Sequence, residues 1–336
     1  MAIWQIIKII LIVIIIILLS VFVGQVVFNK TYQFPPKIEY GVTFSSSYAQ
    51  YLNLDWQETF IKVLSELKVK NLRIPTYWDA LEKNKGEFSF ADTDFMLSEA
   101  EKRNARVVLV VGFRQPRWPE CYLPKWAAKL SLEEKRAEIL QFVQKTVERY
   151  ENNPSIWAYQ VENEPFLPFF GENCDRRDPD FLKKEVDLVR SLSDKPIIIT
   201  ASGELEIWIT QMQLSDIFGT TLYREVYNPL IGYVSYPILP YFYNLKSQII
   251  RKVFAPQNQK TIISELQAEP WLIGETITQD PKRQTELFPV NKLIANIDYA
   301  RKVGFDRAYL WGVEWWYWME KMGYPEYLEY AKILFK

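Results

Sequence analysis

The hydrophobic and polar positions divide the chain into two parts. Residues 9–28 are almost continuously apolar, interrupted only by Ser20, Gly24 and Gln25. A run of about twenty such residues is long enough to cross a hydrocarbon core. After residue 38, short β-branched runs alternate with longer amphipathic stretches. That alternation is typical of βα units built around a parallel sheet.

The first part predicts an uncleaved transmembrane helix at residues 1–30, followed by a linker at 31–37. A cleavable signal peptide is the alternative, but its apolar region is usually shorter and ends at a small-x-small cleavage site, which is not evident here. The few flanking lysines do not fix the orientation. Because single anchors at the extreme N-terminus commonly deliver the rest of the chain to the outside, we expect an anchor in the cytoplasmic membrane and an extracytoplasmic domain.

The second part contains eight predicted strands with helical patterns between them. The strands are expected at 38–44, 71–76, 106–112, 157–163, 196–201, 216–220, 261–266 and 307–312, and the sixth has the weakest pattern. The clearest helices are expected at 55–68, 92–104, 132–150, 181–192 and 290–303, with others near 245–254 and 326–335. Residues 223–243, rich in Tyr, Pro and Gly, predict a long loop.

Eight strands and their helices in about 300 residues predict a (β/α)₈ TIM barrel, an α/β fold, as a single domain at 38–336. An open, doubly wound sheet is the alternative. Its dinucleotide-binding form has no support, because no Gly-x-Gly-x-x-Gly follows the first strand.

The composition excludes several kinds of chemistry. The chain has no histidine, which rules out Ser-His-Asp and Cys-His catalysis and most zinc sites. A formal net charge of −1 gives no basic footprint for nucleic acid and makes a neutral ligand the simpler expectation. We therefore expect no metal, no organic cofactor and no nucleic-acid partner.

The only two cysteines, Cys121 and Cys174, both lie in stretches that are typical of loops. In the predicted barrel these are neighbouring loops on one face. Either a disulfide formed outside the cytoplasm or two free thiols fits this placement.

Two glutamates each close a strand-like segment. Glu164 ends the run that begins at Trp157, and Glu265 ends the run that begins at Thr261. Because the carboxyl ends of barrel strands surround one mouth, we expect the two carboxyl groups to face one pocket. Cleaving a glycosidic bond requires a proton donor for the leaving oxygen and a second carboxylate at the oxocarbenium-like centre. Glu162 shares the strand parity of Glu164, so we expect it to point into the barrel below this pair.

Two motifs resemble one group of enzymes. The triplet Asn163-Glu164-Pro165 matches the strand-four motif of clan A of the glycoside hydrolases, and residues 157–164 are similar to that segment in family 42 β-galactosidases. A second pattern, from the predicted second strand into the following helix, is similar to the same family: Arg73, Trp78, Glu82, Gly86, Phe88, Phe90 and Asp94. The chain thus looks like a member of clan A, which also includes the cellulase-like family 5.

The resemblance implies roles for residues of this chain. Glu164 would be the general acid/base and Glu265 the nucleophile of a retaining double displacement. Arg73 would lie beside Glu265, Asn163 would hydrogen-bond the sugar 2-hydroxyl, and Tyr223 would hold the nucleophile. For Arg73 a purely structural ion pair is the alternative.

Five tryptophans are expected at the mouth of the barrel. Trp311, at the end of the last strand, resembles the aromatic floor of the clan's site. Trp118, beyond the third strand, and Trp315, Trp316 and Trp318, beyond the eighth, are expected to form cleft walls, and packing in the core is the alternative for each.

The sequence therefore predicts a membrane-anchored retaining glycoside hydrolase that cleaves β-linked oligo- or polysaccharides. A transglycosidase would use the same site, and a carbohydrate-binding barrel without catalysis is the alternative from another class. Clan members often place histidines around the reacting sugar, so the absence of histidine leaves the sugar and linkage undetermined.

Overall fold

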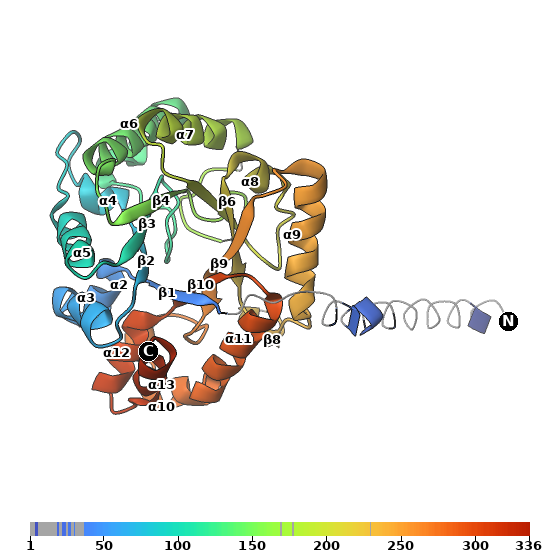
Figure 1. Ribbon diagram of the computed structural model, residues 1–336. Coiled ribbons are helices and arrows are strands. Elements are labelled where there is room, and N and C mark those ends of the chain that lie inside the picture. The colour runs from blue at the N-terminus through green and yellow to red at the C-terminus, as the bar shows by residue number, and fades with distance from the viewer. Residues whose placement is uncertain are drawn as a thin grey trace.

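The computed structural model describes residues 37–336 except 169, 177 and 229, together with residues 4–5, 19, 22–24, 26–27 and 30. Eight parallel strands close into a barrel, ringed by helices (Figure 1). In their order around the barrel, the strands are β1 (Glu39–Thr43), β10 (Arg307–Trp311), β9 (Lys260–Gln267), β6 (Ile217–Leu222), β5 (Ile197–Ala201), β4 (Ile156–Val161), β3 (Arg106–Val111) and β2 (Asn71–Pro75). The predicted (β/α)₈ barrel is confirmed.

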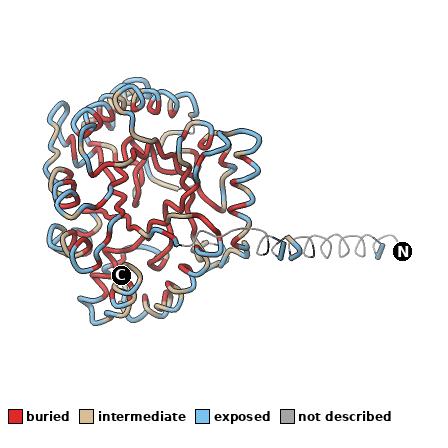
Figure 2. The backbone as a smooth tube through the Cα atoms, in the orientation of Figure 1, coloured by how far each residue is buried: buried red, intermediate tan, exposed pale blue. Residues whose placement is uncertain are grey.

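The helices lie outside the barrel (Figure 1). They are α2 (Ser46–Tyr51), α3 (Trp56–Ser65), α4 (Trp78–Leu81), α5 (Ala91–Lys102), α6 (Leu132–Tyr150), α7 (Pro179–Leu192), α8 (Ile209–Leu214), α9 (Pro240–Phe254), α10 (Pro281–Leu287), α11 (Val290–Val303), α12 (Val313–Lys321) and α13 (Glu326–Leu334). Figure 2 shows buried backbone along the strands and exposed backbone on the outer sides of the helices.

Helix α6 illustrates why these segments become helices. Ser131 and Glu134 form a capping box, which satisfies free N–H groups of the first turn. Its buried residues recur at helical spacing and face the barrel: Ile139, Phe142, Val143, Thr146, Val147 and Tyr150. One face is therefore buried while the charged residues remain in water.

The region of the predicted long loop differs from expectation. It contains an antiparallel hairpin, β7 (Glu225–Asn228) and β8 (Gly232–Ser235), and the weakly predicted sixth strand, β6, pairs with β5 and β9. Gly219 interrupts the apolar run of β6 because a Cβ there would lie 2.8 Å from Cγ2 of Thr200. Close strand contact thus explains the weak pattern.

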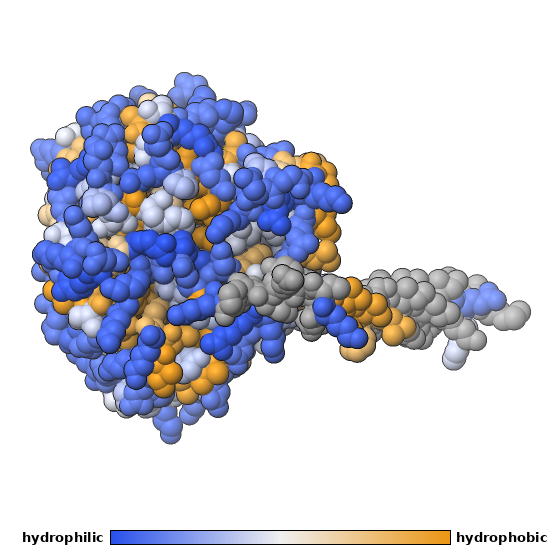
Figure 3. All heavy atoms as spheres, viewed as in Figure 1, coloured by the Kyte–Doolittle hydropathy of each residue, from blue (hydrophilic) through white to orange (hydrophobic). Residues whose placement is uncertain are grey.

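The predicted anchor and linker, 1–30 and 31–37, lie mostly outside the described residues. Within the part of the chain that is described, no helix is both long and apolar enough to span a bilayer. The anchor stays a prediction. The face seen in Figure 3 is largely hydrophilic, and apolar side chains lie along α9, where Leu245, Ile249 and Val253 are exposed.

Candidate active site

Polar side chains from several strands converge at the C-terminal mouth of the barrel. Parallel strands bring their carboxyl ends to one rim, so residues far apart in sequence meet there. The group consists of Arg73 on β2, Gln160 on β4, Asn163 and Glu164 just after β4, Tyr223 just after β6, Glu265 on β9 and Trp311 at the end of β10.

Arg73 is the centre of this group and is 1% exposed. Its guanidinium donates to Oε1 of Glu265 at 2.8 Å, to Oδ1 of Asn163 at 2.6 Å and to Oε1 of Gln160 at 2.7 Å. A buried charge is tolerated when it is paired and hydrogen-bonded in this way. Arg73 therefore fixes Glu265 and Asn163 relative to each other.

The carboxylate of Glu265 is held at both oxygens. Arg73 donates to Oε1, and the hydroxyl of Tyr223 donates to Oε2 at 2.9 Å. Burial, and after it the negative charge of Glu265, raises the pKa of Tyr223 well above its usual value. The phenol therefore stays protonated and remains a donor, and the two contacts hold the carboxylate in one orientation.

Glu164 has a different environment. Its Oε1 accepts from the hydroxyl of Thr221 at 3.3 Å, and its backbone N–H donates to Thr200 Oγ1 at 2.9 Å. Burial raises the pKa of Glu164 well above its ordinary value, and the negative charges of Glu265 and Glu206 raise it further. Glu164 thus holds its proton more tightly than an ordinary glutamate, whereas Glu265 lies against a guanidinium.

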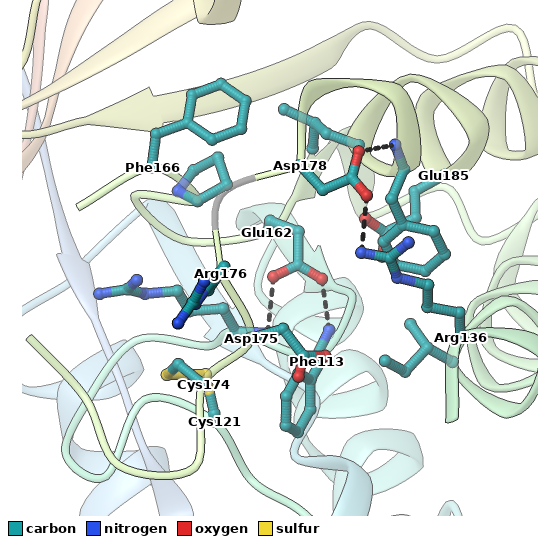
Figure 4. A pocket seen from close by; sticks show the side chains of 15 residues that line it. Phe113, Cys121, Arg136, Glu162, Phe166, Cys174, Asp175, Arg176, Asp178 and Glu185 are labelled. Carbon is teal, nitrogen blue, oxygen red and sulfur yellow. Dashed lines mark hydrogen bonds and ion pairs between the residues drawn. A yellow bond between two sulfur atoms is a disulfide. The ribbon is translucent and has the colours of Figure 1, made fainter. Parts of the chain in front are cut away.

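Glu162 does not point into the barrel as expected. Glu162 and Glu164 have φ values of 59° and 43°, and this left-handed backbone ends the alternation of side chains that the strand parity assumed. The carboxylate of Glu162 accepts from the backbone N–H groups of Phe113 and Arg114. It lies in a small cavity beside α6 and α7, where Figure 4 shows it between Phe113, Arg136 and Glu185.

The Glu162–Glu185 pair predicts how stability depends on pH. Burial raises the pKa of Glu185 well above its usual value, and its hydrogen bond to Glu162 raises it further. Above about pH 5 the folded chain then keeps a proton that the unfolded chain releases, so the free energy of unfolding falls as pH rises. Glu185→Gln keeps a hydrogen-bond donor without titrating. Urea unfolding at several pH values gives the free energy of unfolding. In Glu185→Gln we expect it to fall with pH less steeply than in the wild type, by up to about 1.4 kcal/mol per pH unit.

A matched control for this measurement is Glu148→Gln, which removes an exposed glutamate from the neighbouring helix α6. Its unfolding curve should follow the wild-type pH dependence. Identical slopes for the wild type and Glu185→Gln between pH 5 and 8 would show that the buried pair does not exchange its proton on unfolding.

Aromatic residues form the rim of the mouth. Trp311 is 9% exposed, and Trp118 is 56% exposed. The Trp118 ring packs edge-on against Phe170 at 5.5 Å, and Trp271 links Phe170 to Tyr223 at 5.6 and 5.5 Å between ring centroids. Sequence reasoning missed Phe170 and Trp271, although Trp271 follows shortly after the end of β9. The rim offers flat apolar faces of the kind on which sugars stack.

Trp315 does not form a cleft wall, and that expectation is wrong. Its side chain is fully buried, its indole N–H donates to Oε1 of Gln284 at 2.8 Å, and its ring packs against Tyr327 at 4.6 Å. Helix α12 begins just after the last strand. Trp315 lies on the side of this helix that packs against α10 and α13. The residue supports the fold below the rim. Trp316 and Trp318, which were also expected to form cleft walls, are buried as well.

A buried ion network beside Trp311 was also missed. Arg117 donates to Glu269 and, at 2.9 Å, to Oε2 of Glu314. Its guanidinium lies between the rings of Tyr48, at 3.8 Å, and Trp311, at 4.2 Å. The sequence signal was the cluster of charged residues in the Pro-containing loop after β3. The network holds Trp311 at the mouth by cation–π stacking.

The loops after β3 and β4 are joined covalently. A disulfide connects Cys121 to Cys174, with 5.3 Å between the Cα atoms. Glu172 on the second loop also donates its backbone N–H to the carbonyl of Pro119 on the first. Among the described residues, no group of three or more histidine, cysteine or acidic side chains could hold a metal ion.

Comparisons with known proteins agree with this arrangement. Residues 49–180 match glycosyl hydrolase family 10. A GH5_18 structure from Bifidobacterium longum is 13% identical with a TM-score of 0.58, covering 82% of this chain and 69% of that one. A GH5_18 structure from Streptomyces cattleya in complex with GlcNAc is 11% identical with a TM-score of 0.56, covering 82% and 70%. The resemblance to clan A glycoside hydrolases is confirmed.

A β-galactosidase from the psychrophilic Marinomonas ef1 has a similar fold, with 14% identity, a TM-score of 0.53 and coverage of 81% of this chain. The chain spans only 54% of that enzyme's length. No curated protein sequence matches the chain. At these identities the solved structures show the fold, while the match to family 10, which includes both motif regions, supports glycosidase activity.

Proposed function

We propose that this chain is a retaining β-glycosidase that acts on neutral oligo- or polysaccharides. The observation that supports it best is the contrast between two carboxyl groups at one barrel mouth. Burial favours the protonated form of Glu164, whereas Arg73 and Tyr223 hold Glu265 as a hydrogen-bond acceptor. One group can therefore donate a proton while the other attacks.

In the proposed mechanism, an oxygen of Glu265 attacks the anomeric carbon while Glu164 transfers its proton to the leaving oxygen. A covalent glycosyl-enzyme forms, and the aglycone leaves. Glu164, now ionised, then takes a proton from a water molecule that displaces Glu265 from the sugar. Arg73 orients Glu265 in both steps, which reduces the reorganisation that each step requires.

The other residues of the mouth would position the sugar. The amide oxygen of Asn163 accepts from Arg73 and one of its N–H groups donates to Glu120, so its second N–H is available for the 2-hydroxyl of the reacting sugar. Trp311 would lie under that sugar, and the exposed ring of Trp118 would stack on a further unit. The substrate would then be bound mainly by neutral hydrogen bonds and aromatic faces.

We propose further that the barrel works outside the cytoplasm, held at the cytoplasmic membrane by the predicted helix at 1–30. The Cys121–Cys174 disulfide supports this location, because structural disulfides persist in oxidising compartments. Protease added to intact cells should digest the barrel. Protection of the barrel until the membrane is broken would place it in the cytoplasm.

The function can be tested with a panel of aryl β-glycosides and the full-length chain. We expect release of the aryl group, and NMR of the sugar should show that the β-anomer appears first. Initial appearance of the α-anomer would mean inversion. Binding of oligosaccharides without turnover of any glycoside would indicate a carbohydrate-binding barrel, and elongated products from oligosaccharides would indicate a transglycosidase.

The raised pKa of Glu164 predicts the pH profile. The protonated form is the active acid, so kcat/KM should fall about tenfold per pH unit once pH exceeds this pKa, which lies well above that of an ordinary glutamate. The fall should be steep for an alkyl or unactivated aryl aglycone. A dinitrophenyl aglycone needs little protonation, so Glu164→Gln should cleave it without that basic limb. If kcat/KM falls at high pH in the same way in the wild type and in Glu164→Gln, the group that titrates there is not Glu164.

A further inference from the structure

A third carboxyl group, that of Glu120, lies beside the two proposed catalytic ones. It is 3% exposed, and its Oε2 accepts from Nδ2 of Asn163 at 3.1 Å and from Nε of Arg114 at 3.4 Å. The negative charge of Glu265 acts on Glu120, and that of Glu120 acts on Glu164. Three acidic groups thus share one mouth, although only two have a place in the mechanism.

The loop after β3 holds Glu120 firmly. Its backbone N–H donates to the carbonyl of Arg117, and its carbonyl accepts from the N–H of Gln115, both at 2.7 Å. Glu120 has a φ of 69°, and its neighbour Cys121 carries the disulfide to the loop after β4. The carboxyl group is therefore placed by rigid backbone, as a group that orients a ligand must be.

An ion pair with Arg114 does not account for Glu120. Arg114 also donates to the carbonyls of Leu167 at 2.9 Å and Phe170 at 2.7 Å, so its guanidinium has nearer partners. Burial raises the pKa of Glu120 to about 7, with Arg114 lowering it and Glu265 raising it. No described residue donates to its Oε1. A buried acid with a free acceptor next to a reacting centre is typical of ligand binding.

We propose that Glu120 accepts a hydrogen bond from the 3-hydroxyl of the sugar whose bond is cleaved, beside the 2-hydroxyl that Asn163 contacts. This inference rests on the proposed function. Asn163 Nδ2 donates to Glu120 Oε2 at 3.1 Å, so the amide and the carboxylate lie side by side, as two groups that contact neighbouring hydroxyls of one sugar must lie. Nδ2 keeps its second hydrogen for the sugar. Glu120 thus selects sugars with a free donor at position 3.

The test compares two substrates in two proteins. The substrates are the aryl β-glycoside that the wild type cleaves best and its 3-deoxy analogue, and the proteins are the wild type and Glu120→Gln. A charge-assisted hydrogen bond to the substrate predicts a loss in kcat/KM of about 10- to 100-fold when either partner is removed. Removing both should cost little more than removing one.

A purely structural role for Glu120 would lower kcat/KM equally for both substrates. Equal losses, or no loss with the parent glycoside, would overturn the inference. Glu172→Gln is the matched control, because it removes an exposed carboxylate from the loop bonded to Glu120. It should leave kcat/KM for both substrates at the wild-type value.

Failure of the Glu120 contact can be distinguished from failure of the proposed glycosidase function. Turnover by the wild type decides whether the chain is a glycosidase. The same two-by-two comparison, made by calorimetry of the corresponding disaccharide and its 3-deoxy analogue in the Glu265→Gln background, detects the contact through binding alone. A 3-deoxy penalty that disappears with Glu120→Gln supports the contact even without turnover, and an unchanged penalty contradicts it.

Discussion

Replacing Glu265 by glutamine is expected to lower kcat by about 10³-fold or more, because an amide cannot form the glycosyl ester that the double displacement requires. The glutamine oxygen can still accept from Arg73, and its NH2 group can donate to the hydroxyl oxygen of Tyr223, the two groups that hold the native side chain at 2.8 and 2.9 Å. The fold and sugar affinity should therefore survive. Release of the aryl group under saturating substrate measures kcat, and calorimetry measures affinity.

The control for this variant is Glu172→Gln, which removes an exposed carboxylate outside the mouth and should keep wild-type turnover. A Glu265→Gln protein that retains more than about a tenth of the wild-type kcat would mean that another group forms the bond to the sugar. A loss of sugar affinity together with activity would instead indicate that the substitution disturbed the mouth.

Replacing Arg117 by methionine is expected to lower the free energy of unfolding by about 3–5 kcal/mol, the usual cost of leaving a buried charge without its partner. Arg117 is the cation between Glu269 and Glu314, and both glutamates are buried. Burial already raises the pKa of each, and Arg117 opposes that rise. Without the guanidinium, both carboxyls must be neutralised or remain as uncompensated charges.

Urea denaturation at pH 7 measures this loss. Adding Glu269→Gln and Glu314→Gln to Arg117→Met should restore much of the stability, because the unpaired charges are then removed. A destabilisation below about 1 kcal/mol for the single variant would show that the network contributes no more than an exposed ion pair. No recovery in the triple variant would assign the loss to the stacking of Arg117 on Tyr48 and Trp311.

The barrel could be predicted because each strand is a short apolar run between helical patterns. The predictions for the hairpin and for helix α12 fail because apolar strand runs and helical patterns do not alternate clearly there. The hairpin of β7 and β8 consists of two four-residue strands, too short for alternation to stand out among the surrounding Tyr and Pro residues. Helix α12 is apolar on nearly all sides, so it carries no amphipathic stripe and its tryptophans looked like rim residues.

The centre of the site was predictable for a related reason. Glu164, Glu265, Arg73 and Tyr223 lie at or near strand ends, and closing the barrel brings such residues together. Glu162 could not be placed, because its orientation depends on a left-handed φ rather than on strand parity.

The contacts of the loop after β3 could not be predicted from the sequence, for a different reason. Arg117 and Glu120 reach the mouth through the loop's own backbone bonds and the neighbouring disulfide. Their partners are remote in sequence: Asn163 for Glu120, and Glu269 and Glu314 for Arg117. No periodic pattern encodes such contacts.

The most direct test of the account is to trap the sugar on the protein with an activated 2-fluoro β-glycoside, which slows the second step more than the first. Peptide mass spectrometry should find one sugar per chain on the peptide that contains Glu265, and none on the Glu265→Gln variant. A protein that turns over aryl β-glycosides yet accumulates no adduct, or that carries the sugar on Glu164, would contradict the assignment of Glu265 as the group that binds the anomeric carbon.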